Sequence, residues 1–363
     1  VLSKATRRCF SAPSPKGTAY GIAPFEEITI DNYREGILLG MEEQKAEIEA
    51  IINNPEEPTF QNTIVAMDQS GKLLRKVRGT FSPLTSSNST EESRALEKEL
   101  SPLMSAHSDD INLNEKLFAR VKKVYDNREN IKLTPEEKTV LENIYKRFVN
   151  SGAELSETEK EKLRELNQQL SMLELTFSQN LLHETNNTFV VANSLEELKG
   201  LPQANIDAAA KMAADNGQPG KWMFNMQRPS CNPVLQYCEN RDLRKKVYDA
   251  YYNRGNTGNE YDSKEICRQL VTLRLEKAKL MGYNNYAEMV LEDRMAKTPE
   301  AVFELLDQVW EPAVAKAKEE LDDIRAEIRK EGKDFEPAGW DYMYYLDKAK
   351  RAKYSVDEQE IRE

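Results

Sequence analysis

The segment from Ser156 to about His183 constrains the fold of this chain more than any other. Ser156 and Glu159 have the spacing of a capping box, in which two residues satisfy each other's backbone N–H groups at a helix start. Large apolar residues then recur at alternating intervals of three and four, which places them on one face of a helix on the order of 40 Å long. These residues are Leu163, Leu166, Leu170, Leu173, Phe177 and Leu181. A coiled-coil dimer could cover such a stripe, but neighbouring helices of one domain are favoured because the flanking sequence supplies them.

Helical signals also dominate the rest of the chain. The sequence has 15 Gly and 15 Pro among 363 residues, about 8% together, so turn punctuation is sparse against an average of roughly 12%. Thr134 and Pro135 mark a helix start, with Thr at the N-cap and Pro in the first turn. Further helices are predicted from Asp31 to about Ile52, Thr59 to about Phe81, Glu91 to about Ser105, Asn114 to about Asn130, Asp242 to Tyr252, the Asp262–Glu265 capping box to Leu280, Thr298 to about Lys330 with a kink at Pro312, and Trp340 to about Lys353. The serine- and threonine-rich Thr85–Thr90 is predicted as a loop, and Ser355–Glu363 has the pattern of one more helix opening.

The region 184–240 departs from this pattern. Thr188–Val191 and Trp222–Met226 are short and rich in β-forming or large apolar residues, which predicts a small two-stranded element. An alanine-rich helix is expected between them over Asn205–Ala214, and Pro229 and Pro233 are predicted to bracket a turn. The predicted fold is therefore all-α: a long-helix bundle, with a small β element near residues 188–230, after an extended leader over residues 1–24.

Composition excludes two classes of partner. The chain has 51 basic and 62 acidic residues and a net charge of −11, which disfavours nucleic acid because phosphate binding needs a basic face. No apolar run approaches 18 residues, so no membrane span is expected. The N-terminus has neither an apolar signal-peptide core nor an initiator Met. We expect a soluble protein, with the compartment left open between cytoplasm and periplasm.

Histidine and cysteine are too sparse for the common catalytic arrangements. The two histidines, His107 and His183, are far apart in the sequence, whereas a catalytic zinc site usually needs two or three imidazoles. The segment that begins at His183 and Glu184 starts like an H-E-x-x-H zinc helix, but Asn187 stands where the second His would be, so we interpret His183 as a surface residue of a last helical turn. The four cysteines show no metal-binding spacing. They are Cys9, Cys231, Cys238 and Cys267; a local Cys231–Cys238 bridge is the alternative to free thiols.

Three other segments carry weaker functional signals. Gly255–Asn259 lacks the Gly-Lys-Ser/Thr of a phosphate-binding loop and the acidic ligands of an EF-hand, so a turn is favoured. Carboxylate pairs at 319–320 and 322–323 alternate with Lys and Arg and indicate a solvated helix face. The aromatic segment Trp340–Tyr345 is too broad for one helix face, so it either packs in the core or contributes a surface that contacts peptide or sugar.

A set of motifs, in order from about residue 24 to the end, resembles one family. The motifs are Pro24–Ile28, Pro58–Thr63, Leu170–Phe177, Asn240–Arg244 with Ala250-Tyr251 and Arg254-Gly255, Arg274–Tyr283, and Trp340-Asp341 with Tyr344-Tyr345. Together they resemble the thimet-oligopeptidase and peptidyl-dipeptidase family of zinc metallopeptidases, closest to its bacterial peptidyl-dipeptidase branch.

This resemblance implies a nearly all-helical protein whose two halves flank a narrow channel for short oligopeptides. It also implies zinc chemistry on an H-E-x-x-H helix with a third Glu ligand, which lies C-terminal to the Trp-Asp-x-x-Tyr-Tyr segment in the family. On this interpretation residues 25–363 are the N-terminal portion of a peptidase. No position of this chain is assigned a catalytic, metal-binding or substrate-binding role, no Zn²⁺ is expected on the chain by itself, and its partners would be oligopeptides and the missing C-terminal half.

The alternative is a free-standing helical scaffold that binds peptides or a partner protein. The peptidase interpretation predicts an exposed apolar face on the 299–330 helix and on part of Trp340–Tyr345, which the missing half would cover. In that helix Val314, Ala317, Leu321, Ile324 and Ile328 are expected to continue a core stripe.

Overall fold

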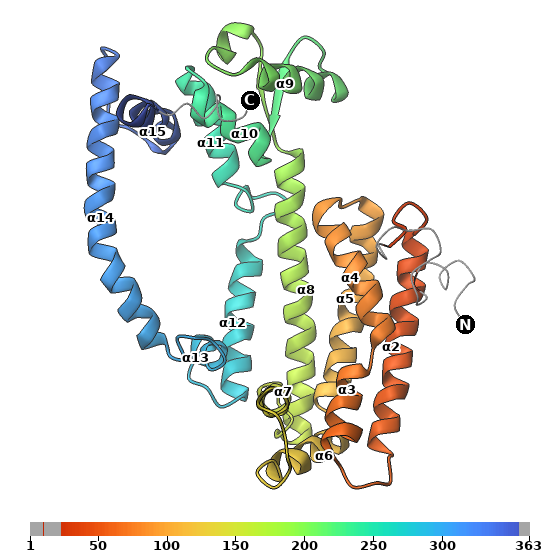
Figure 1. The fold of residues 1–363 in the computed structure, drawn as a ribbon. Helices are drawn as coiled ribbons and strands as arrows, with labels where there is room; N and C mark the ends of the chain where they lie inside the picture. Colours follow the sequence, from red (N-terminus) through yellow and green to blue (C-terminus); the bar gives the residue numbers. More distant parts are fainter. Residues whose placement is uncertain (1–9, 11–22, 356–363) are drawn as a thin grey trace. The chain divides into compact units, whose positions relative to one another are not determined.

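The structure is a computed structural model that describes residue 10 and residues 23–355, and these residues are mostly helical (Figure 1). They divide into two compact units. Unit 1 comprises Val1–Thr176 and Gln269–Met289, and unit 2 comprises Phe177–Arg268 and Val290–Glu363. The leader expected over residues 1–24 lies outside the described residues except for Phe10, Ala23 and Pro24, and the helix expected to open at Ser355 lies outside them beyond Ser355.

Unit 1 is built from helices that pack side by side. Its elements are α2 (Ile30–Ile52), the π-helical η2 (Phe60–Val65), α3 (Ala66–Gln69), α4 (Lys72–Ser87), α5 (Glu91–Asn112), α6 (Glu115–Asp126), α7 (Pro135–Asn150) and parts of α8 (Glu157–Asn187), α12 (Lys264–Leu280) and α13 (Tyr286–Leu291). Figure 1 shows α2 beside α4 and α5, and these pairs are in contact. Ile37, Val77 and Leu96 are fully buried where α2, α4 and α5 meet, and a second apolar cluster joins α2 to α6 and α7.

Unit 2 holds the small β element. It contains the end of α8, β1 (Phe189–Ala192), the 3-10 helix η3 (Leu195–Leu198), α9 (Gln203–Asp215), β2 (Trp222–Asn225), α10 (Arg228–Tyr237), α11 (Arg241–Tyr252), α14 (Pro299–Lys330) and α15 (Gly339–Tyr354). Strands β1 and β2 are antiparallel, with Phe189 opposite Asn225 and Ala192 opposite Trp222. The predicted all-α fold with a β element near 188–230 is thus confirmed. None of the helices in the described residues is both long enough and apolar enough to cross a membrane.

Helices α8 and α7 begin where the sequence indicates. The Ser156 N–H donates to Glu159 Oε2 at 2.9 Å, and α8 follows. At α7 the Thr134 hydroxyl accepts from the Glu137 N–H, as expected. At α2 the expectation was wrong by two residues: Thr29, not Asp31, is the cap, because Thr29 and Asn32 each accept a hydrogen bond from the other's backbone N–H.

Three predicted boundaries in unit 1 were wrong. The helix predicted over 59–81 is broken after Ser70, where Gly71 adopts a left-handed backbone with φ 67° that ends one helix and starts another. The predicted 85–90 loop begins only at Asn88, because the Ser86 and Ser87 hydroxyls donate to the Pro83 carbonyl and so satisfy polar groups within the helix. Helix α5 runs past Ser105 to Asn112.

Two expectations in unit 2 were also wrong, and one short helix was missed. Pro229 and Pro233 lie within α10 rather than around a turn, and Pro229 occupies the first turn, where a missing N–H leaves no helical hydrogen bond broken. Of the stripe predicted on α14, only Ile324 and Ile328 are buried, because only the last turns of α14 pack on the tyrosines of α15. The short helix α13 was not predicted, since six residues carry too few turns to show periodicity.

Helices α2 and α4 approach closely because α2 presents glycines to α4. A Cβ on Gly40 would lie 2.8 Å from the backbone N and Cα of Leu74, and a Cβ on Gly36 would lie 3.0 Å from Val77 Cγ2. Backbone atoms cannot move aside as a flexible side chain can. The absence of a side chain at Gly40 therefore sets the distance between the two helices.

Two alanine substitutions test this contact. Gly40→Ala is expected to lower the free energy of unfolding by about 1–3 kcal/mol, because the added methyl pushes against the α4 backbone. Gly79→Ala is the matched control within α4, since its Cβ would meet no atom within 4 Å. It is expected to raise stability by roughly 0.5–1 kcal/mol through helix propensity alone. Urea unfolding followed by circular dichroism measures both; equal gains from the two variants would contradict the close packing.

Candidate functional site

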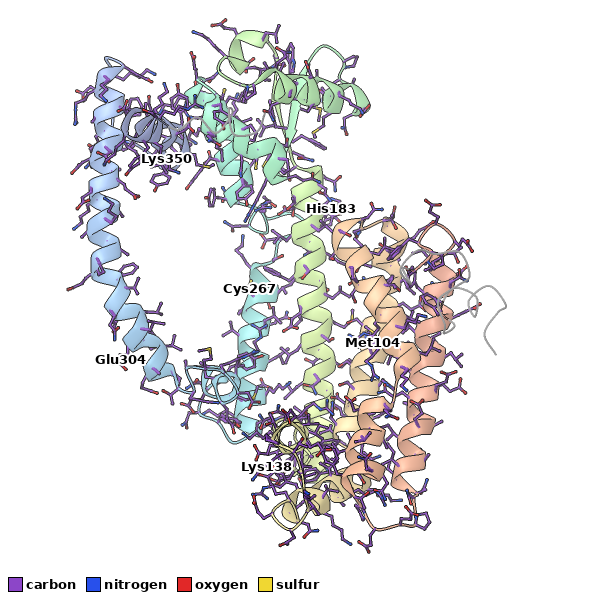
Figure 2. The ribbon with its side chains drawn as sticks, in the orientation of Figure 1. Met104, Lys138, His183, Cys267, Glu304 and Lys350 are labelled. Atoms are coloured by element: carbon purple, nitrogen blue, oxygen red, sulfur yellow. The ribbon has the colours of Figure 1, made fainter. Side chains whose placement is uncertain are left out.

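The two histidines that the sequence singled out belong to different units and have different surroundings. His107 on α5 is buried at 6% exposure, and its Nε2 lies 2.8 Å from Gln44 Oε1 of α2. His183 on α8, labelled in Figure 2, stacks on Tyr261 with ring centroids 3.7 Å apart. The Asn187 amide nitrogen donates to the His183 carbonyl oxygen at 3.0 Å. Asn187 therefore closes the last turns of α8.

Glu184, next to His183, is the organising side chain of a loop in unit 2. It is only 3% exposed, and it accepts hydrogen bonds from the Thr257 hydroxyl at 2.6 Å, the Asn259 amide nitrogen at 2.9 Å and the Gly255 N–H. Burial alone would raise the pKa of Glu184, but these three hydrogen bonds outweigh burial and lower it. The carboxylate is ionised at neutral pH and fixes Gly255–Asn259 as the turn that the sequence predicted.

A second buried carboxylate, Asp341, joins α11 to α15 in unit 2. Asp341 is fully buried and lies within the aromatic segment Trp340–Tyr345. Arg241 contacts it through Nε and Nη2, at 3.0 Å and 2.8 Å, and Arg244 Nη2 lies 2.8 Å from Oδ1. Arg244 is 1% exposed, and its remaining nitrogens donate to the carbonyl oxygens of Cys238, Glu239 and Trp340.

The aromatic residues around Asp341 are mainly structural. Tyr344 and Tyr345 are buried, and the Arg244 guanidinium lies 4.2 Å from the Tyr344 ring centroid. The core-packing alternative therefore holds for these two tyrosines. Tyr342 remains 42% exposed, so one member of the segment is available to a partner.

The described cysteines are free thiols, and two of them are buried. Cys231 and Cys238 are buried free thiols, so the alternative of a local bridge is wrong. Burial raises the pKa of both thiols, which keeps them protonated and unreactive at neutral pH. Cys267 is a free exposed thiol, and Cys9 lies outside the described residues.

The metal that the family resemblance implies does not fit the described residues. Among residues 10 and 23–355, no group of three or more His, Cys, Asp or Glu side chains is placed to hold a metal ion. The buried carboxylates of Glu184 and Asp341 already accept hydrogen bonds from protein donors. We therefore derive no catalytic step through a metal from this chain, and the assignment of no catalytic or metal-binding residue to it stays a prediction.

The most exposed apolar surface of unit 2 lies on the first half of α14. Figure 2 labels Glu304 there, and side chains project from this helix on several sides. Five large apolar residues are each more than half exposed: Phe303, Leu305, Leu306, Val309 and Trp310. Isolated exposed apolar residues are ordinary, but five within eight positions form a continuous patch that is typical of an interaction surface. The exposed face predicted for this helix is confirmed, and its occupant is treated below.

Comparison with known proteins identifies relatives of this chain. Residues 234–363 match the model of Peptidase family M3. The chain is 34% identical over 342 residues to a dipeptidyl carboxypeptidase of Escherichia coli (strain K12), covering 94% of the chain and 50% of that protein. It is 30% identical over 356 residues to an oligopeptidase A of Haemophilus influenzae, covering 97% of the chain and 52% of the relative. These matches confirm the family resemblance that the sequence motifs indicate.

The matches cover nearly all of this chain but only part of each relative. A probable cytosolic oligopeptidase A of Arabidopsis thaliana, 28% identical, is covered over 50% of its length. The chain spans about half the length of the curated relatives it matches.

Proposed function

We propose that this chain is the N-terminal, non-catalytic portion of a zinc metallopeptidase that releases dipeptides from the C-termini of oligopeptides. The observation that carries the proposal is the match along 94% of the chain to half of a dipeptidyl carboxypeptidase. In this proposal the chain forms one wall of the substrate channel. The zinc and its ligands belong to the other half.

The exposed patch on α14 supports the proposed partner. Leu306 and Trp310 lie four positions apart on one helical face and are 55% and 68% exposed. An uncovered apolar face of this kind is stabilised by burial against a second apolar surface. We propose that the remaining half of the parent protein covers it. The relatives are about twice as long as this chain, which supports this assignment.

A peptidase assay tests the proposal. The chain by itself is expected to contain no stoichiometric zinc and to leave an internally quenched fluorogenic peptide intact. Addition of the downstream half encoded by the same gene is expected to produce turnover that a chelator abolishes. Chelator-sensitive turnover by this chain alone, with bound zinc, would overturn the assignment of the chemistry to the other half.

Variants on α14 separate the peptidase half from the free-standing scaffold. The double variant Leu306→Lys with Trp310→Lys is expected to reduce the turnover regained with the downstream half at least tenfold, because it places two charges in the apolar contact. Glu304→Lys on the same helix is the control and is expected to have little effect. A gene that ends after Glu363 and encodes a monodisperse chain would instead favour the scaffold.

A further inference from the structure

A polar cavity of about 520 Å³ lies in unit 1 among α4, α5, α7, α8, α12 and α13. Eight of its 15 lining residues are serines or asparagines, and its aliphatic part is Met104, labelled in Figure 2, with Leu170. Its ionisable lining residues are Arg78, Asp109, Glu174, Lys277 and Tyr286. Because acidic and basic groups both line the cavity, neither sign of charge is favoured in a ligand. The lining suits a small, uncharged molecule that carries hydroxyl groups.

Lys277, in the last turn of α12, brings an amine to this lining. The residue is partly exposed, and its Nζ donates to Asn167 Oδ1 of α8 at 2.6 Å. The Asn167 amide nitrogen in turn donates to Asp109 Oδ1 of α5 at 2.9 Å, which fixes the orientation of the amide. A neutral acceptor therefore holds the amine at a defined place beside the cavity.

The carboxylates near Lys277 are engaged with other groups. Glu174 pairs with Arg274 at 2.7 Å, and Asp109 accepts from Asn167. Lys277 itself forms no ion pair with any residue that the structure describes. Burial lowers the pKa of Lys277 and outweighs the attraction of Asp109 and Glu174. At neutral pH more of this amine is therefore unprotonated than of an exposed lysine.

An unprotonated lysine amine reacts with carbonyl compounds. Its lone pair forms a bond to the carbonyl carbon of an aldehyde, and a proton moves from nitrogen to the carbonyl oxygen. The resulting carbinolamine loses water, which carries away that oxygen, and an imine remains. One aldehyde and one amine thus give one imine and one water, and no oxidant or reductant is consumed.

We propose that this cavity binds a small uncharged hydroxyaldehyde and that Lys277 Nζ forms an imine with it. The serine and asparagine side chains bind the hydroxyl group, and Asn167 positions the amine. The cavity volume leaves room for such a ligand beside the amine. This inference concerns unit 1 alone and needs neither a metal nor the other half, so it stands apart from the peptidase assay.

Reductive trapping tests the reaction on the whole chain. Glycolaldehyde is the probe, and sodium cyanoborohydride at pH 7 converts any imine to a stable secondary amine that peptide mass spectrometry locates. Lys277 is expected to be labelled at least about tenfold faster than Lys279, an exposed lysine on the same helix. Equal or slower labelling of Lys277 would overturn the proposal.

A second aldehyde tests recognition of the hydroxyl group. Propanal has nearly the size of glycolaldehyde but carries a methyl group in place of the hydroxyl. The rate at Lys277 divided by the rate at Lys279 removes the difference in intrinsic reactivity between the two aldehydes. This ratio is expected to fall at least about fivefold with propanal, because a polar lining left unpaired disfavours the methyl group. The same ratio for both aldehydes would contradict binding of a hydroxyaldehyde.

A variant tests the positioning role of Asn167. Asn167→Asp places a carboxylate against Nζ, which favours the ammonium form, and is expected to slow labelling of Lys277 at least about tenfold while Lys279 is unchanged. Asn143→Asp makes the same change at an exposed position of α7 and should alter neither rate. Circular dichroism confirms that each variant is folded. Undiminished labelling of Lys277 in folded Asn167→Asp would contradict the role of Asn167.

The pH profile of the native chain provides a measurement that needs no variant. Labelling of Lys277 is expected to reach its plateau at a lower pH than labelling of Lys279, because its free amine forms at a lower pH. Lys277→Arg, which keeps a positive charge but has no amine, confirms the assignment of the labelled peptide. Coincident pH profiles for the two lysines would overturn the proposed reactivity of Lys277.

Discussion

Asp341→Ala is expected to lower the free energy of unfolding of unit 2 by about 3–5 kcal/mol, the usual range when one partner of a buried ion pair is removed. Arg244 is the reason. It is 1% exposed, and Asp341 is its only carboxylate partner among the described residues. Without that carboxylate, a guanidinium charge remains in a desolvated site between α11 and α15. The two helices would lose their only described ion-pair contacts.

The measurement can be confined to unit 2. The three tryptophans, Trp222, Trp310 and Trp340, all lie there. Urea unfolding followed by tryptophan fluorescence therefore reports unit 2, whereas circular dichroism reports both units. Asp341→Asn keeps one acceptor oxygen and is expected to lose less stability than the alanine variant.

A surface ion pair provides the control. Glu336 is 78% exposed and pairs with Arg325 at 3.0 Å, so Glu336→Ala is expected to change stability by less than about 1 kcal/mol. A similar small change for Asp341→Ala would show that the buried network does not hold α11 to α15.

The same carboxylate makes unit 2 sensitive to acid. Burial alone would raise the pKa of Asp341, but hydrogen bonds from Arg241, the Ala338 N–H and Arg244 outweigh burial and lower it below its usual value of 3.8. A lowered pKa in the folded state contributes stability above the unfolded pKa and loses it as pH falls through the folded value. The difference in stability between the native chain and Asp341→Asn should therefore shrink below about pH 4.

Local sequence signals were sufficient for much of the fold. The Thr134-Pro135 start of α7 and the 156–159 start of α8 depend on residues within one helical turn, so the sequence alone determines them. The boundaries that were wrong depend on packing. The helix breaks at Gly71 because the Gly71 N–H donates to the carboxylate of Glu47 on α2. This contact joins residues 24 positions apart, so no local sequence pattern reveals it.

The functional side chains were less predictable than the helices. Arg241, Arg244 and Asp341 stood in recognised motifs, yet their contact joins positions about a hundred residues apart. The sequence placed Glu184 in a failed zinc motif, whereas its actual partners lie over 70 residues downstream. The sequence signal available for these sites was an acidic residue within an otherwise apolar or turn-forming segment. Pairing them with their donors required the tertiary structure.

Glu184→Gln is expected to destabilise unit 2 by about 2–3 kcal/mol and to expose the 255–259 turn to proteolysis. The glutamine is nearly the same size, but its amide nitrogen cannot accept, so it faces at least one of the donors from Gly255, Thr257 and Asn259 without a bond. An unsatisfied buried donor costs about 1–3 kcal/mol, and the lost charge weakens the remaining hydrogen bonds. Tryptophan fluorescence in urea measures the stability, and limited proteolysis with mapped cleavage sites measures the opening of the turn.

The control for Glu184→Gln lies in the same unit. Glu304 of α14 is exposed, so Glu304→Gln makes the same chemical change without touching the turn and is expected to alter stability by less than about 0.5 kcal/mol. Thr257→Val provides the reciprocal test, because it removes one donor and leaves the carboxylate with two. We expect it to be milder than Glu184→Gln, since a carboxylate that keeps two hydrogen bonds is better satisfied than three donors facing an amide. If Thr257→Val were the more damaging of the two, the Thr257 side chain would hold the turn through packing and the Glu184 carboxylate would not be its organising group.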